Sequence, residues 1–131
     1  MDQATLQVFT RKFATILGLA GIAAVHIMDL PGKFHETPYL GVAYLGIIAI
    51  SIVLIERLVV KNRQIDYLAS AALAAGVFAG FVINRTVGMP GAMGDRGNWF
   101  EPLGMLSLFI EAFTVWQAMR GAKQSTRLAR A

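Results

Sequence analysis

Residues 39–55 read YLGVAYLGIIAISIVLI, an apolar run without a charged side chain. As an α-helix, a run of this length crosses most of the hydrocarbon core of a bilayer, with slight thinning or tilt supplying the rest. The same helix in water would expose an apolar surface that the few polar residues of this chain could not cover. Residues 39–55 therefore predict a membrane-spanning helix.

Three similar runs flank this one, at about residues 13–30, 65–83 and 100–119. The whole chain has the same character: 56% of its 131 residues are hydrophobic, 15% are charged, and the mean hydropathy is +0.56. The first run resembles the apolar part of a signal peptide but is too long to be one. We predict an all-α integral membrane four-helix bundle that forms a single transmembrane domain over residues 1–131.

Lysine and arginine residues predict the orientation of these spans. Nine of them lie on the side of the predicted membrane that also holds both termini (Arg11, Lys12, Arg57, Lys61, Arg63, Arg120, Lys123, Arg127 and Arg130). Three lie on the other side (Lys33, Arg85 and Arg96). Basic residues concentrate on the cytoplasmic side of membrane proteins, so we expect both termini to be cytoplasmic, N-in and C-in. The net charge of +4 is then explained by orientation and anionic headgroups rather than by nucleic acid.

Small residues and prolines predict how the helices pack and where they end. Gly76 and Gly80 form a G-x-x-x-G pattern, and Gly18 and Gly21 offer a similar face on the first span, so both faces are expected to make close helix contacts. Pro31 and Pro38 are expected to bracket the first connection, and Pro102 to lie in the first turn of the fourth span.

The fourth span carries the one acidic residue near the predicted middle of the membrane, Glu111. It belongs to a small and polar stripe with Ser107, which should face the interior of the bundle. An ionised carboxylate is costly at this depth, so Glu111 is expected to be protonated, hydrogen-bonded, or paired with a cation or water. A structural hydrogen bond and a proton or cation role are both consistent with this position.

The outer side of the membrane gathers imidazole and carboxylate groups. His26 and Asp29 are one helical turn apart, His35 and Glu36 follow, and Glu101 lies in the last connection. These groups could together bind a divalent metal ion, although helix capping and headgroup contact explain the same residues. A haem is not proposed, because His26 is the only histidine inside a span.

The last connection also predicts an ion-pair network. Arg85 ends the third span within reach of the carboxylates of Asp29, Glu36 and Glu101, while Asp95 and Arg96 follow it in a glycine-rich and proline-containing segment. Such a network would hold the connection as a lid over the outer end of the first span.

Several motifs of this chain resemble those of a family of small bacterial four-helix integral membrane proteins of unassigned function. They are H-I-M-D-L-P at 26–31, R-T-V-G-M-P-G at 85–91 and W-F-E-P-L-G at 99–104, followed by Ser107, Leu108 and Glu111. The resemblance covers most of the chain and implies the four-helix fold and a multi-pass location in the bacterial cytoplasmic (inner) membrane.

The sequence favours a non-catalytic function. It has no cysteine, and it shows no catalytic nucleophile motif and no phosphate-binding loop. We expect an accessory subunit that packs against other membrane subunits or against copies of itself. The alternative is a self-contained metal-binding, cation-binding or proton-coupled transport protein that uses the outer histidine and carboxylate residues together with Glu111.

Overall fold

The computed structural model describes residues 2–130, and these residues form four long α-helices and no strand. The helices are α1 (Gln3–Glu36), α2 (Pro38–Val60), α3 (Gln64–Thr86) and α4 (Pro102–Arg130), and a short 3-10 helix, η1 (Met93–Asp95), lies between α3 and α4. Each of the four is long and apolar enough to cross a membrane, as a multi-pass membrane protein requires. The prediction of an all-α chain with four such helices is confirmed.

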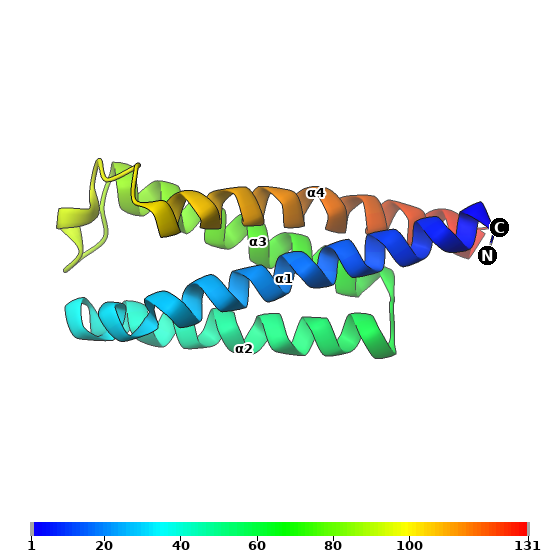
Figure 1. Ribbon diagram of the computed structural model, residues 1–131, viewed down its shortest axis with the longest axis horizontal. Helices are drawn as coiled ribbons and strands as arrows, with labels where there is room; N and C mark the ends of the chain where they lie inside the picture. Colours follow the sequence, from blue (N-terminus) through cyan, green and yellow to red (C-terminus); the bar gives the residue numbers. More distant parts are fainter. Residues whose placement is uncertain (1, 131) are drawn as a thin grey trace.

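The four helices lie side by side and alternate in direction, as Figure 1 shows. α1 packs mainly against α2 and α4, α3 packs mainly against α4, and α2 and α3 touch each other much less. Both chain ends lie at one end of the molecule (Figure 1), which we call the terminal end. The opposite end, which we call the loop end, contains residues 31–38 and the α3–α4 connection, residues 87–101.

α1 is longer than the sequence predicted, because it continues through Pro31 to Glu36. The prediction that Pro31 marks the first connection is therefore wrong, and that connection is the single residue Thr37. Proline removes one hydrogen bond from a helix, but a long helix packed along its neighbour retains all the others. Pro38 begins α2, where a helix does not use its N–H group. Pro102 begins α4 in the same way, as predicted.

The α2–α3 connection at the terminal end is fixed by one buried carboxylate. Asp66 accepts a hydrogen bond from the backbone N–H of Arg63 at 2.9 Å and forms an ion pair with Arg57 Nε at 2.5 Å. Between the helices, Asn62 adopts a φ of 52°, a left-handed conformation that asparagine tolerates better than most residues. These contacts set where α2 stops and where α3 starts.

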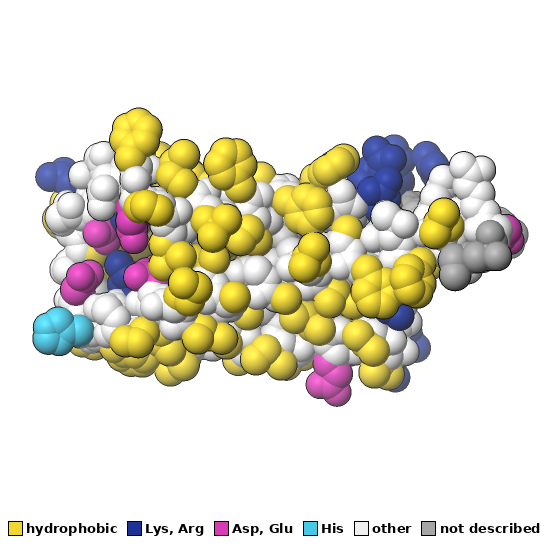
Figure 2. Space-filling view, viewed as in Figure 1, with side chains coloured by type: hydrophobic (Ala, Val, Ile, Leu, Met, Phe, Trp, Pro, Cys, Tyr) yellow, Lys and Arg dark blue, Asp and Glu magenta, His cyan; other side chains and the backbone are white. Residues whose placement is uncertain are grey.

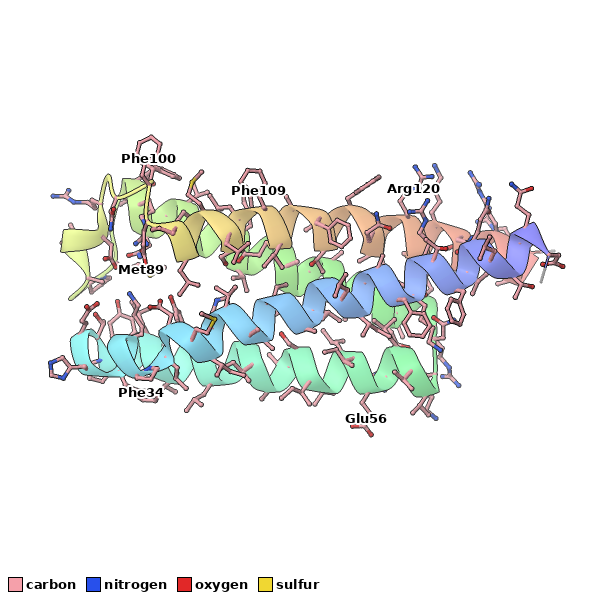
Figure 3. The ribbon with its side chains drawn as sticks, in the orientation of Figure 1. Phe34, Glu56, Met89, Phe100, Phe109 and Arg120 are labelled. Atoms are coloured by element: carbon pink, nitrogen blue, oxygen red, sulfur yellow. The ribbon has the colours of Figure 1, made fainter. Side chains whose placement is uncertain are left out.

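Hydrophobic side chains cover the middle of the molecule, and charged side chains gather toward its two ends, as Figure 2 shows. Phe100 and Phe109 point away from the other helices in Figure 3, and their exposed fractions are 88% and 70%. Inside, a buried cluster joins α1, α2, α3 and α4 near the terminal end (Leu19, Leu54, Leu58, Tyr67 and Ala122). The exposed apolar belt is the surface expected to face lipid.

Glycines explain how closely α1 approaches α4. A side chain at Gly18 would collide with Thr114, and a Cβ atom at Gly21 would lie 3.0 Å from Ile110. The predicted packing role of these two glycines is confirmed. The same prediction for Gly76 and Gly80 is wrong, because, apart from the adjoining backbone of α3 itself, no atom of the described residues lies within 4 Å of the Cβ position at either of them. α3 turns a different face to α4.

Candidate functional site

Gly76 and Gly80 instead line a cavity of about 410 Å³ in the half of the molecule nearest the loop end. All four helices contribute to its walls, together with Met89 from the α3–α4 connection. Ala43 of α2 and Gly76 of α3 line it and are exposed, so the cavity opens sideways where these two helices are apart. In Figure 3 Met89 lies between the α1–α2 pair and the α3–α4 pair, at the loop end.

The cavity is apolar over most of its depth and polar at the loop end. Its apolar wall is formed by small and aliphatic side chains (Val25, Leu40, Ala43, Ile47, Ala72, Leu73 and Val77). Its polar side chains come from every long helix and from the α3–α4 connection (His26, Asp29, Tyr44, Asn84, Arg85, Glu101 and Ser107). A site with this division suits a molecule that has an apolar body and one polar end.

Arg85 is the central polar group of the cavity and is only 5% exposed. Its Nη2 atom donates to Glu101 Oε2 at 2.6 Å, and its Nη1 atom lies 3.5 Å from Asp95 Oδ2. The guanidinium carbon lies 4.6 Å from the centre of the Phe81 ring. Within the described residues, neither Nε nor Nη1 of Arg85 has a hydrogen-bond partner. A buried arginine therefore presents two unused N–H donors.

The ion-pair network extends from Arg85 toward α1. Asp95 accepts a hydrogen bond from Asn84 Nδ2 at 3.1 Å and forms an ion pair with Lys33 Nζ at 3.5 Å. Burial raises the pKa of Asp95, but the Asn84 hydrogen bond and the charges of Lys33 and Arg85 outweigh it and hold the pKa below its usual 3.8. Arg96, which the sequence placed in this network, is exposed and forms no ion pair with any described residue.

His26 and Asp29 line the cavity from α1, and Tyr44 lines it beside them from α2. His26 is 5% exposed, and its Nδ1 atom lies 2.7 Å from the Ile22 carbonyl oxygen. Since a carbonyl only accepts, Nδ1 carries the proton and Nε2 is left for another partner. The Tyr44 ring meets His26 edge-on at 4.7 Å between ring centres, and its hydroxyl donates to Asp29 Oδ2 at 3.3 Å.

The divalent metal site predicted from the sequence does not assemble in this structure. His35 and Glu36 are exposed at the end of α1 and do not line the cavity that contains His26 and Asp29. The Glu101 carboxylate forms an ion pair with the guanidinium group of Arg85. Among residues 2–130, no group of three histidine, aspartate or glutamate side chains is placed to hold a metal ion. The helix α1 separates these residues because it continues past Pro31.

Ser107 connects the cavity to Glu111, one turn further along α4. The Ser107 side chain lines the cavity, and its hydroxyl donates to Glu111 Oε2. Glu111 is 0% exposed, and its Oε1 atom has no hydrogen-bond partner in the described part of the chain. The predicted stripe therefore faces the interior. A proton or cation role for Glu111 stays a prediction.

Sequence reasoning missed three side chains of this site. Tyr44 and Asn84 line the cavity, and Lys33 joins the ion-pair network through Asp95. The buried position of Lys33, which is 6% exposed, follows from the extra turn of α1 after Pro31. Basic and acidic side chains in alternation at a predicted helix end are the signal that could have identified it.

The lining of the cavity combines one cation with several acceptors. The Arg85 guanidinium group lies in the same lining as Asp29, Asn84 and His26, beside apolar walls. Comparison with models of known protein families, with curated proteins and with solved structures finds no match to this chain.

Proposed function

We propose that this chain is a membrane-embedded binding protein that takes up an amphipathic molecule sideways, from the lipid, through the opening between α2 and α3. The observation that carries the proposal is Arg85, a guanidinium group that is 5% exposed and has two N–H donors without partners at the end of an apolar cavity. An unsatisfied buried donor costs stability. A bound polar group that accepts from Nε or Nη1 would remove this cost.

The depth of the cavity fits one leaflet of a bilayer. Its α3 wall extends from Ala72 to Arg85, thirteen residue steps along the helix, which span about 20 Å at 1.5 Å per residue. The hydrocarbon core of a bilayer is about 30 Å thick, so the cavity reaches from the headgroup level to near the middle. A ligand would place its polar end at the interface beside Arg85 and its tail among Val77, Gly76 and Leu73.

The proposed setting is the bacterial cytoplasmic membrane, with the four helices as a transmembrane bundle. The terminal end carries nine lysine and arginine residues and the loop end carries three, so we place the terminal end in the cytoplasm. The cavity then opens to the outer leaflet. The accessory-subunit interpretation stays a prediction, and it is compatible with a ligand site because α4 has lipid-facing side chains far from the opening, such as Phe109.

Filling the cavity with a leucine tests the proposal. Gly76→Leu puts a side chain into the opening, where no atom of another described helix lies within 4 Å of the new Cβ position. Gly46→Leu is the matched control, since Gly46 is also exposed on a long helix with open space around it but does not line the cavity. Both variants should fold, and leucine favours helix more than glycine in each.

Tryptophan emission can report the binding of dodecanol as a probe in lipid nanodiscs. The chain has two tryptophans, and Trp116→Phe leaves only Trp99, whose ring centre lies 6.0 Å from that of the cavity residue Phe81. We expect dodecanol to change the Trp99 emission saturably in this background and in Gly46→Leu, but not in Gly76→Leu. A response that is the same with Gly76→Leu as with Gly46→Leu would refute a binding site in the cavity.

A further inference from the structure

Resting on the proposed function, we infer that the ligand of this cavity has an uncharged polar end that both donates and accepts hydrogen bonds, such as the hydroxyl of a single-chain alcohol or quinol, rather than a carboxylate or phosphate. The polar end of the cavity determines this choice through two properties. One is the balance of its charges, and the other is the set of hydrogen-bonding atoms that have no partner.

The charges that line the cavity do not favour an anion, although Arg85 is the central group. Asp29 and Glu101 contribute two negative charges and Arg85 contributes one positive charge, so the lining carries one net negative charge with His26 counted as neutral. Glu101 lies 2.6 Å from the guanidinium group, and Asp95 lies 3.5 Å from it. An added anion would meet a positive charge that is already balanced, together with the repulsion of the carboxylates.

Asp29 contributes most of this repulsion, because it lacks a compensating cation. Its carboxylate accepts a hydrogen bond from the Tyr44 hydroxyl at 3.3 Å, and it forms no ion pair with a described residue. The remaining charges at this end are paired, as Lys33 lies 3.5 Å from Asp95. A carboxylate-ended ligand would have to approach the unpaired carboxylate of Asp29, and the two negative charges would repel each other.

The atoms without partners are both donors and acceptors, which is the second property. Nε and Nη1 of Arg85 and Oδ1 of Asn84 have no hydrogen-bond partner among residues 2–130, and all three atoms are covered by neighbouring atoms, so a ligand reaches them only when these side chains turn toward the cavity. A hydroxyl group can accept from Arg85 and donate to Asn84 or Asp29 at the same time. A carboxylate or phosphate dianion can only accept, so it would leave Asn84 Oδ1 unsatisfied.

The size of the cavity limits the apolar part of the ligand. A volume of about 410 Å³ lies toward the lower end of the range for small-molecule sites, roughly 300–1,000 Å³. The walls near Gly76 and Gly80 are smooth, because these residues have no side chains. This shape fits a single flexible tail that lies along α3 rather than a lipid with two acyl chains.

Three probes with the same tail separate the possible head groups: dodecanol, dodecanoate and dodecyltrimethylammonium. Each is titrated into nanodiscs that hold the Trp116→Phe protein, in a buffer alkaline enough to ionise dodecanoate, and Trp99 emission is followed. We expect dodecanol to bind at least tenfold more tightly than dodecanoate. Tighter binding of dodecanoate or of the ammonium probe would overturn the inference but leave the proposed function standing. If none of the three gives a saturable change, the proposed function fails as well.

A pair of isosteric variants tests the physical reason. Asp29→Asn removes the unpaired charge from the lining and should raise the ratio of dodecanoate affinity to dodecanol affinity several-fold. Glu36→Gln removes the same charge from the same end of the molecule, but this side chain is 65% exposed and lies outside the cavity, so dodecanoate binding should not change. Equal effects of the two variants would show that the head-group preference comes from the surface charge of the protein and not from the cavity.

Discussion

The Arg85–Glu101 pair allows the most direct test of the structure, through the variant Glu101→Gln. The guanidinium group is 5% exposed and the Glu101 side chain is 35% exposed, so the replacement leaves a buried cation without its nearest counter-charge. Removing one partner of a fully buried ion pair costs roughly 3–5 kcal/mol. Glu101 is partly solvated and Asp95 remains 3.5 Å away, so we expect a smaller loss, about 2 kcal/mol of unfolding free energy.

Glu36→Gln is the control for this prediction. Glu36 lies 3.9 Å from Lys33, but its side chain is 65% exposed, and exposed ion pairs contribute roughly 0–1 kcal/mol. Both variants remove one negative charge from the loop end without changing the side-chain shape. The unfolding free energy can be measured for each by titrating SDS into dodecylmaltoside micelles and following tryptophan emission.

A double variant distinguishes an orphaned charge from a lost hydrogen bond. Arg85→Met together with Glu101→Gln leaves no unpaired guanidinium group, and apolar replacements of buried ion pairs are often close to neutral. The double variant should therefore be more stable than Glu101→Gln alone, by about 1 kcal/mol or more. Two results would contradict this explanation. One is that Glu101→Gln is as stable as Glu36→Gln. The other is that the stability losses of Arg85→Met and Glu101→Gln, measured singly, add up to the loss of the double variant.

Three further predictions concern packing, pH and orientation. Gly18→Ala should destabilise the protein by roughly 1–3 kcal/mol through overpacking against α4, whereas Gly80→Ala, with open space around it, should be neutral or stabilising in the same SDS titration. Because the pKa of Asp95 lies below its usual 3.8, its stabilising contribution is complete above that value and is lost as the pH falls through the lower, folded-state pKa. Asp95→Asn should therefore be less stable than the wild type at pH 6, with a difference that shrinks toward pH 3; a constant difference would contradict this. The natural chain has no cysteine, so a cysteine placed at Gly94 should label from outside intact cells and one placed at Gln124 should not, and the reverse pattern would mean that the orientation is inverted.

The number and type of the helices could be predicted from the sequence, because apolar runs of membrane-spanning length have few other stable structures. Their ends were less predictable. The sequence predicts a helix end at Pro31, yet α1 continues for five residues beyond it, to Glu36. A proline costs a helix one hydrogen bond and some steric strain, and whether the helix absorbs that cost depends on packing along its neighbour. That packing is a tertiary property that a local pattern does not contain.

The error at Pro31 also explains why part of the site was missed. Once the α1–α2 connection is Thr37 alone, residues at equal distances from it lie at similar depths on two antiparallel helices. Leu30 and Tyr44 are each seven residues from Thr37, so Tyr44 belongs beside Asp29, where its hydroxyl lies. With Pro31 as the helix end, the same count could not be made. The pairing of Arg85 with Glu101 did not depend on it, since both flank the α3–α4 connection.

The cavity could not be predicted from the sequence, and Gly76 and Gly80 show why. Two glycines four residues apart remove the side chains from one strip of a helix, which lets another helix approach closely. The same strip, if no helix approaches, becomes a smooth wall with open space in front of it. Which of these occurs depends on the partner of each helix: α3 packs on α4 through another face, α2 packs on α1, and α2 and α3 touch each other much less. The same pair of glycines can therefore mark a close helix contact or the wall of a cavity. They are distinguished here by Arg85, because a buried guanidinium group with unused donors is costly in a closed contact and useful beside a ligand.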